Sequence, residues 1–486
     1  MKLSIRDNGL LRHDAFIGGE WVPADDRSCM DVINPATGEI ITSVPRMGDV
    51  ETRRAIDAAA TALPAWSGLT AKARAELLRK WFELILANED DLAAIMTAEQ
   101  GKPLTEARGE IRYAASFIEW FAEEAKRIYG DIIPSHKAGA QIVITREPVG
   151  VTAAITPWNF PSAMITRKAG PALAAGCTMI VKPASATPLS ALALAVLAER
   201  AGIPAGVLSI VTGNATRIAG EMTRNPAVRK ISFTGSTDIG KQLMAESAGT
   251  LKKLSLELGG NAPFIVFDDA NIDAAVQGAI ASKFRNAGQT CVCTNRFLVQ
   301  NGVYDSFSRK LVEAVAALKV GDGAEPGVDQ GPLIDRAAVD KVKTHIADAL
   351  AKGARVLHGG EPDPRGGTFF TPTVLADVSS ACEVAKEETF GPLAPLFHFS
   401  DEADAISQAN DTSFGLAAYV YTRDLGRAWR MSSALEYGIV GINEGLISTE
   451  VAPFGGMKES GFGREGSKYG IEDYLEIKYT LMGGLQ

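Results

Sequence analysis

Residues 151–185, VTAAITPWNFPSAMITRKAGPALAAGCTMIVKPAS, contain two short apolar runs separated by a longer amphipathic segment. The run VTAAIT is typical of a buried strand, and SAMITRKAGPALAAG has a helical pattern despite its internal Pro171. CTMIVKP then predicts a second strand. A strand–helix–strand unit of this length connects two parallel strands, so the stretch predicts a parallel sheet with a helix packed on its face.

Strands and helices continue to alternate after this unit. VLSIVTG and RKISFTG are further predicted strands, and a second series follows Glu257 with APFIVF, NIDAAVQGAIASKFRNAG and NRFLVQ. A chain of 486 residues is too long for one hydrophobic core. The pattern therefore predicts an α/β protein with two doubly wound parallel-sheet domains that meet near residue 257.

The segment before the first unit has a different pattern. Apolar residues recur at helical spacing from about Ala71 to Tyr129, which predicts a group of helices. The stretch AQIVITREP, residues 140–148, instead alternates apolar and polar side chains and predicts a strand.

Composition excludes several classes of protein. The net charge is −9 and no basic block is present, which argues against binding to nucleic acid or to an anionic membrane. The most apolar run, at residues 191–198, is far shorter than the roughly 20 residues of a membrane span. The N-terminal residues lack the apolar core of a secretory signal. The chain has five cysteines, and the scatter of Cys29, Cys177 and Cys382 argues against a disulfide framework and favours a cytoplasmic location.

Two of the five cysteines, Cys291 and Cys293, lie in the stretch GQTCVC. Two thiolates supply half of a tetrahedral zinc site, but the histidines lack ligand spacing, which disfavours a metal without settling the point. A disulfide between them would close a strained ring and would suit reversible inactivation under oxidation better than a structural role. We interpret Cys293 as a buried small side chain and Cys291, in a loop before a strand, as a nucleophile.

A cysteine with an ordinary pKa is mostly protonated at neutral pH, so a nucleophile needs companions. Glu257 precedes a Gly-Gly turn in LSLELGGN, where partial burial would make it a usable general base. Asn159 is held between two prolines in ITPWNFP and can donate to an oxyanion, although a turn asparagine is the ordinary alternative. Taken alone, Glu257 has an equally ordinary alternative as a solvated acid.

Two further strand ends carry groups suited to a nucleotide. SFTGSTDIG, residues 232–240, combines a strand, a glycine and a helix start, where backbone N–H groups bind phosphate. It is not the Gly-x-Gly-x-x-Gly fingerprint of the usual dinucleotide fold. Lys182, at the end of another strand in VKPAS, can reach a ribose or a phosphate, or can simply be solvated.

These motifs, with EETFGP and PFGGMKESGFGREGS, occur in the order found in the aldehyde dehydrogenase superfamily, and the chain resembles that family along most of its length. The resemblance implies a cofactor-binding domain of residues 1–130 and 150–256 and a catalytic domain of residues 257–442. It also implies an oligomerisation arm of residues 131–149 and 470–486, and hence a homodimer or homotetramer.

The resemblance assigns roles to individual residues. Cys291 is expected to attack the aldehyde, with the oxyanion held by Asn159, and Glu257 to activate the water that hydrolyses the thioester. Ser185 stands where some members have an acidic residue that repels a 2′-phosphate, so NADP is expected with or ahead of NAD. The implied cofactor contacts are Trp158, Asn159, Lys182, Ser185, Gly235, Ser236, Leu258, Glu388 and Phe390.

Three more residues bear on the substrate. Arg167, Arg285 and Ser448 resemble the residues that hold the distal carboxylate in succinate-semialdehyde dehydrogenases. Arginines pair well with both oxygens of a carboxylate, although each could form an ordinary ion pair instead. Glutarate semialdehyde, one carbon longer, remains a competing substrate. The sequence is also compatible with a broad-specificity enzyme whose arginines are structural, and with a catalytically silent binding protein, although retention of the catalytic residues argues against the latter.

Overall fold

The strand–helix–strand unit lies in the middle of an eight-stranded sheet in the computed structural model, which describes residues 5–485. Strand β7 (Val151–Ile155) runs parallel to β8 (Thr178–Lys182), and α5 (Ala163–Ala175) connects them. The sheet order is β2-β1-β9-β8-β7-β10-β11-β21. Its other strands are β1 (Ala15–Ile17), β2 (Glu20–Val22), β9 (Leu208–Ile210), β10 (Val228–Thr234), β11 (Lys253–Glu257) and β21 (Gly461–Phe462).

The edges of this sheet depart from the parallel pattern. Strands β1 and β21 pair antiparallel with their neighbours, and β2 pairs antiparallel with β1. A two-residue turn at Gly18 and Gly19, both with positive φ, joins β1 to β2. Such a turn adds an edge strand without the crossover helix that a parallel strand needs. The alternation of strands and helices in the sequence therefore does not predict this edge strand.

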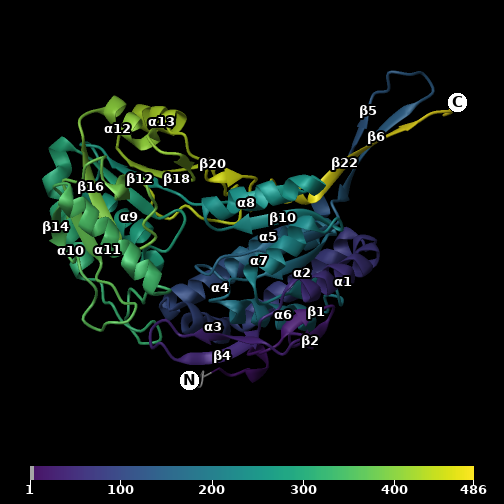
Figure 1. Cartoon of the computed structure of the whole chain (residues 1–486). Coiled ribbons are helices and arrows are strands. Elements are labelled where there is room, and N and C mark those ends of the chain that lie inside the picture. Colours follow the sequence, from purple (N-terminus) through teal and green to yellow (C-terminus); the bar gives the residue numbers. More distant parts are fainter. Residues whose placement is uncertain (1–4, 486) are drawn as a thin grey trace.

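Helices cover both faces of the first sheet (Figure 1). Ala154 and Val181 face one core with α5, whereas their neighbours Ala153 and Ile180 face a second core on the opposite side. The helices are α1 (Asp49–Ser67), α2 (Ala71–Ala87), α3 (Glu89–Gln100), α4 (Leu104–Glu124), α6 (Pro188–Ala201), α7 (Ala215–Arg224) and α8 (Thr237–Ser247).

The second lobe is built around a seven-stranded sheet of order β14-β15-β16-β13-β12-β18-β19, parallel except at β14. Alternate residues again face two cores, with Ile265 on one side and Phe264 on the other. Its strands are β12 (Ala262–Val266), β13 (Thr294–Gln300), β14 (Arg355–His358), β15 (Thr373–Ala376), β16 (Leu393–Phe399), β18 (Ala417–Tyr421) and β19 (Ile439–Ile442). Its helices are α9 (Ile272–Lys283), α10 (Tyr304–Ala316), α11 (Arg336–Ala351), α12 (Glu402–Asn410) and α13 (Leu425–Ala434).

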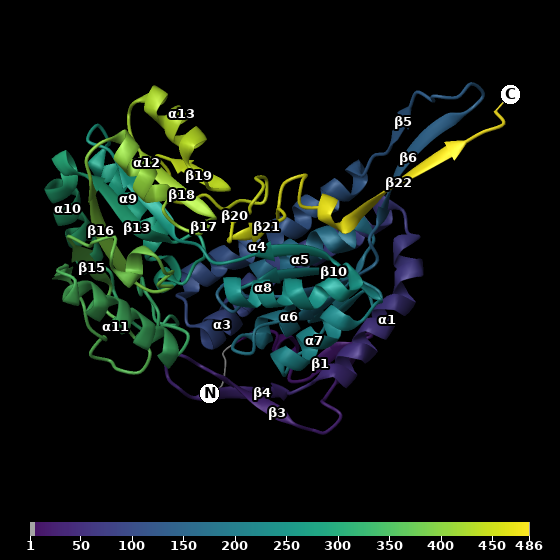
Figure 2. The ribbon, with the colours of Figure 1, turned by 45° about the horizontal axis from the view of Figure 1, so that its top comes forward.

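A three-stranded antiparallel arm of β5 (Asp131–Ile133), β6 (Gln141–Pro148) and β22 (Leu475–Met482) projects away from both lobes (Figures 1 and 2). Two small sheets pair β3 (Cys29–Ile33) with β4 (Ile40–Pro45), and β17 (Phe414–Gly415) with β20 (Met457–Lys458). Short 3₁₀ helices lie at Asn8–Leu10, Ala125–Arg127, Ala248–Thr250, Arg285–Gly288, Asn301–Val303, Glu383–Ala385 and Glu472–Tyr474.

The helix expected to run to Gly288 is shorter than its pattern suggests. Helix α9 ends at Lys283, and Asn286 and Ala287 adopt left-handed backbone conformations. Gly288 follows with φ 76°, and a Cβ there would lie 2.2 Å from the carbonyl oxygen of Gly391. Contacts with the 391 segment therefore turn the chain early, so that a tight loop leads into Cys291.

Across residues 5–485, no helix combines the length and the apolar character that a membrane crossing requires. Strand β11 ends at residue 257 in the first sheet and β12 begins at 262 in the second, so the chain changes lobes at this point. The exact domain limits remain a prediction.

Candidate active site

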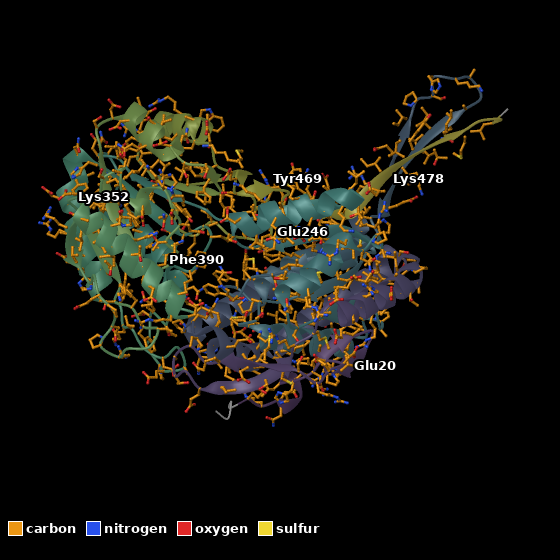
Figure 3. The ribbon with its side chains drawn as sticks, viewed as in Figure 1. Glu20, Glu246, Lys352, Phe390, Tyr469 and Lys478 are labelled. Carbon is orange, nitrogen blue, oxygen red and sulfur yellow. The ribbon has the colours of Figure 1, made fainter. Side chains whose placement is uncertain are left out.

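A cavity of about 190 Å³ lies where the carboxyl ends of β7, β10 and β11 meet loops of the second lobe. Ligands of open α/β sheets bind at this edge. Figure 3 labels Phe390 at the junction of the two lobes. The lining residues are Pro157, Trp158, Asn159, Thr234, Gly235, Ser236, Leu258, Gly259, Cys291, Glu388 and Phe390.

Cys291 lies in this lining, three residues after the glycine that ends the tight loop. Burial raises the pKa of its thiol to about 12, an effect that the nearby Arg167 opposes. The loop packs closely against the segment that joins β11 to β12, because a Cβ on Gly260 in that segment would lie 2.5 Å from the carbonyl oxygen of Cys291. In this state the sulfur is a protonated thiol and needs a base or a bound ligand to become reactive.

Glu257 is the last residue of β11 and is 3% exposed. Neither of its carboxylate oxygens has a hydrogen-bond partner among residues 5–485. Burial, reinforced by the charge of Glu465, raises the pKa of Glu257 well above its usual value, although Arg167 and Lys168 act against this. A carboxyl group in such a place is a proton acceptor with a pKa shifted toward neutral pH.

A buried ion cluster of Arg167, Lys168 and Glu465 acts on Glu257. The sequence motifs do not identify Lys168 and Glu465 as members of this cluster. Lys168 donates a hydrogen bond to Thr234 at 2.7 Å and forms an ion pair with Glu465. Arg167 also pairs with Glu465, with Nε 2.8 Å from Oε2. Lys168 adjoins Arg167 in sequence, and Glu465 lies in the motif GREGS, but neither signal identifies the contact.

Asn159 is buried and its side-chain amide is held in one orientation. Its Nδ2 donates to the carbonyl oxygen of Gln289 at 3.1 Å, and its Oδ1 accepts a hydrogen bond from the N–H of Phe160 at 3.1 Å. Lys102 and Asn286 both donate to its backbone carbonyl. Since an amide has two N–H donors, one remains for a ligand next to Cys291.

Seven of the nine residues expected to contact a cofactor line this cavity: Trp158, Asn159, Gly235, Ser236, Leu258, Glu388 and Phe390. Trp158 and Phe390 pack edge to face, with ring centroids 5.5 Å apart. Glu388 accepts a hydrogen bond from the N–H of Gly260 at 3.2 Å, yet burial raises its pKa to about 7. These groups give the cavity two aromatic walls and an acidic end.

The other two expected cofactor residues lie outside the lining. Lys182 ends β8 beside Ile155 of β7, at the same edge of the sheet, and is 4% exposed. Its ammonium makes no hydrogen bond or ion pair within the described part of the chain, and burial lowers its pKa to about 8. Ser185 is exposed three residues later. An amine without a protein partner at this edge fits an anionic or hydroxyl-bearing ligand.

A second cavity, of about 280 Å³, contains two of the three expected substrate residues, Arg285 and Ser448. The guanidinium of Arg285 lies 5.2 Å from the ring centre of Phe160. Arg167 is not in this lining; besides its ion pair with Glu465, it lies 4.0 Å from the ring centre of Phe454. The other lining residues are Lys102, Glu106, Gly109, Glu110, Tyr113, Phe160 and Leu446.

All five cysteines are free thiols. Cys293 is buried and its Sγ lies 3.1 Å from the carbonyl oxygen of Lys283, which fits a packing role. Within residues 5–485, no group of three or more His, Cys, Asp or Glu side chains is placed to hold a metal ion. A disulfide with Cys291 remains a prediction.

Known proteins with similar sequences point to one family. A model described as the aldehyde dehydrogenase family matches residues 21–480. A protein of Escherichia coli named succinate-semialdehyde dehydrogenase (NADP(+)) is 67% identical over 481 residues, covering 99% of this chain and 100% of the relative. A glutarate-semialdehyde dehydrogenase of Pseudomonas aeruginosa is 66% identical over 483 residues, with 99% and 100% covered.

A solved structure supports the same assignment. A succinate-semialdehyde dehydrogenase from Burkholderia pseudomallei superposes with a TM-score of 0.98 at 64% identity, over 99% of this chain and 100% of that one. The expected fold of two doubly wound sheets and a small β arm is therefore confirmed. By sequence and by structure, the chain belongs to the aldehyde dehydrogenase family.

Proposed function

We propose that this protein oxidises succinate semialdehyde to succinate with NADP or NAD, through a thioester on Cys291. One observation carries the proposal: Cys291 and Asn159 share one cavity, with Arg285 in a second cavity bounded by Phe160 next to Asn159. A thiol beside an oxyanion donor suits attack on an aldehyde. An arginine in a cavity separate from that of Cys291 suits a substrate that carries a carboxylate at the end opposite its aldehyde group.

The steps follow from the side chains present. The thiol of Cys291 loses its proton to solvent and its sulfur attacks the aldehyde carbon, and the resulting oxyanion receives hydrogen bonds from Nδ2 of Asn159 and the N–H of Cys291. Loss of a hydride from the former aldehyde carbon re-forms the C=O bond and gives the thioester, and a nicotinamide held in the first cavity would supply the acceptor for that hydride. Glu257 then takes a proton from water, whose oxygen attacks the thioester carbon. The C–S bond breaks, the acid leaves, and the proton held by Glu257 returns to the sulfur, which restores the thiol of Cys291.

The residues of the first cavity fit a nicotinamide nucleotide. Glu388 and Phe390 would hold its ribose and ring, and Gly235 and Ser236 lie at the start of α8, where backbone N–H groups suit a phosphate. The unpaired ammonium of Lys182 supports recognition of a ribose that carries a 2′-phosphate. Ser185 adds no negative charge to repel it, so we propose NADP with or ahead of NAD.

The length of the substrate is the least constrained part of the proposal. One extra methylene changes binding by only about 1–3 kcal/mol, so glutarate semialdehyde remains the alternative. The relatives from Escherichia coli and Pseudomonas aeruginosa include one dehydrogenase for each of these aldehydes. The test compares kcat/KM for succinate semialdehyde, glutarate semialdehyde and uncharged butanal, each with NADP and with NAD. Equal kcat/KM values for the two semialdehydes and for butanal would contradict the proposal.

Replacement of Arg285 by alanine is expected to lower kcat/KM for succinate semialdehyde roughly 30- to 5000-fold, because loss of one partner of a desolvated charge pair costs about 2–5 kcal/mol. The value for butanal should change less than about threefold, since it has no carboxylate to lose. Arg365→Ala, at an exposed loop arginine, is the matched control. A parallel loss for both aldehydes would assign Arg285 a structural role.

Turnover is expected to rise as the pH is raised from the ordinary carboxyl range into the alkaline range. The reason is that Glu257 accepts a proton only when ionised, and its pKa is raised well above the usual value. The raised pKa of the Cys291 thiol acts in the same direction. Steady-state kcat across this range checks the trend, and enzyme returned to pH 8 must regain full activity. A kcat that is flat or falls with rising pH would contradict the assignment.

We also propose that the protein is a homo-oligomer, a dimer or tetramer, assembled through its arm. Ile132, Ile477 and Tyr479 are 71%, 68% and 55% exposed on the arm. Apolar side chains on a projecting sheet are typical of a surface that another subunit covers. The domain limits and the cytoplasmic location, based on scattered free cysteines, remain proposals.

A further inference from the structure

One residue of the second-cavity lining, Tyr113, carries a buried hydroxyl that no protein group satisfies. The OH of Tyr113 has no hydrogen-bond partner among residues 5–485. Three charged groups of this lining are already engaged, because Lys102 pairs with Glu110 and Glu106 accepts a hydrogen bond from the N–H of Asn286. A buried hydroxyl without a partner is costly, so a tyrosine of this kind in a cavity lining is a candidate donor to a ligand atom.

Tyr113 is held firmly in this wall. It lies on α4, and its ring packs edge to face on Phe117 with centroids 5.0 Å apart. Its backbone carbonyl accepts a hydrogen bond from Ser116 at 2.8 Å. Burial raises the pKa of the phenol, against the opposing charges of Arg167 and Arg285, so the hydroxyl remains a proton donor at physiological pH.

A distal carboxylate entering this cavity needs several donors. It has about four lone-pair positions, and an ionised carboxylate without enough donors is costly to bury. Arg167 lies outside this lining and pairs with Glu465, which it shares with Lys168, and the ammonium of Lys102 is already paired with Glu110. Arg285 and Ser448 are the remaining expected donors, and Tyr113 lines the same cavity.

We propose that Tyr113 is a specificity-determining residue whose hydroxyl donates a hydrogen bond to the distal carboxylate of the bound aldehyde. The proposal rests on the proposed function and adds a neutral donor to its substrate site. A neutral donor recognises the carboxylate without adding the desolvation cost of another buried cation.

The test is Tyr113→Phe, which removes the hydroxyl and retains the ring. We expect kcat/KM for succinate semialdehyde to fall about 10- to 100-fold, as for loss of a hydrogen bond to a charged group. The fall should come mainly through KM, and kcat/KM for butanal should be unchanged or higher. An unchanged value for succinate semialdehyde, or an equal loss for both aldehydes, would overturn the proposal.

Two controls distinguish failure of the proposed role of Tyr113 from failure of the proposed function. Tyr421→Phe alters another buried tyrosine, stacked on Phe264 in the second sheet and outside both cavity linings, and should leave both substrates unaffected. If wild-type enzyme shows no preference for succinate semialdehyde over butanal, the proposed function fails. If wild-type enzyme shows the preference and Tyr113→Phe retains it in full, only the role of Tyr113 fails.

Discussion

Enzyme with Glu257 replaced by glutamine is expected to release one equivalent of reduced cofactor and then to stop. Attack by Cys291 and hydride transfer do not need the carboxylate as a base for water, so the first turnover should proceed. Loss of a positioned general base lowers the rate of its step by roughly 10²–10⁴-fold, and glutamine cannot accept the proton. Rapid mixing with absorbance at the reduced nicotinamide band measures both the burst and the steady rate.

Two features make this prediction discriminating. Glutamine has nearly the same volume as glutamate, and the native carboxylate oxygens make no hydrogen bond that the substitution would break among residues 5–485. Glu246→Gln, at a half-buried position of α8 outside both cavity linings and labelled in Figure 3, is the matched control and should behave as wild type. Steady turnover at the normal rate in Glu257→Gln would show that another group activates the water.

Replacement of Asn159 by alanine is expected to slow the burst itself. Removal of one oxyanion donor costs roughly 10²–10³-fold in kcat. Here the donor is well fixed, because Gln289 holds one N–H of the amide and Lys102 holds the backbone carbonyl. The loss should occur in kcat with little change in KM, since the oxyanion exists only after the sulfur has attacked.

The burst rate distinguishes Asn159 from Glu257. Asn159→Ala should lower the rate constant of the first turnover, whereas Glu257→Gln should lower only the later steady rate. Asn301→Ala, at a surface contact with His398, serves as the control for loss of an asparagine amide. A burst in Asn159→Ala within a few-fold of wild type would remove Asn159 from the oxyanion site.

Much of the fold follows from local patterns. The unit at residues 151–185 and the series after Glu257 form the parallel strands that their periodicity predicts. The antiparallel edges do not follow, because a hairpin such as β1–β2 is short and carries no βα signal. The early end of α9 also escapes prediction, since it depends on close approach of Gly288 to Gly391, far along the chain.

The site divides in the same way. Glu257, Asn159 and Cys291 lie in motifs at strand ends, where short stretches of sequence are informative. Lys168 and Glu465 meet across 297 residues of sequence, and the unpartnered hydroxyl of Tyr113 depends on what surrounds it in space. Such contacts leave no local pattern, because an ordinary lysine, glutamate or tyrosine on a helix or loop looks the same in sequence.

The central claim is that the sulfur of Cys291 becomes acylated while the cofactor is reduced. The most direct measurement is peptide mass spectrometry of Glu257→Gln, quenched with acid after one turnover with succinate semialdehyde and NADP. We expect a succinyl adduct on Cys291, none on Cys293, and an amount equal to the reduced cofactor formed. Reduced cofactor without any adduct on Cys291 would contradict the account.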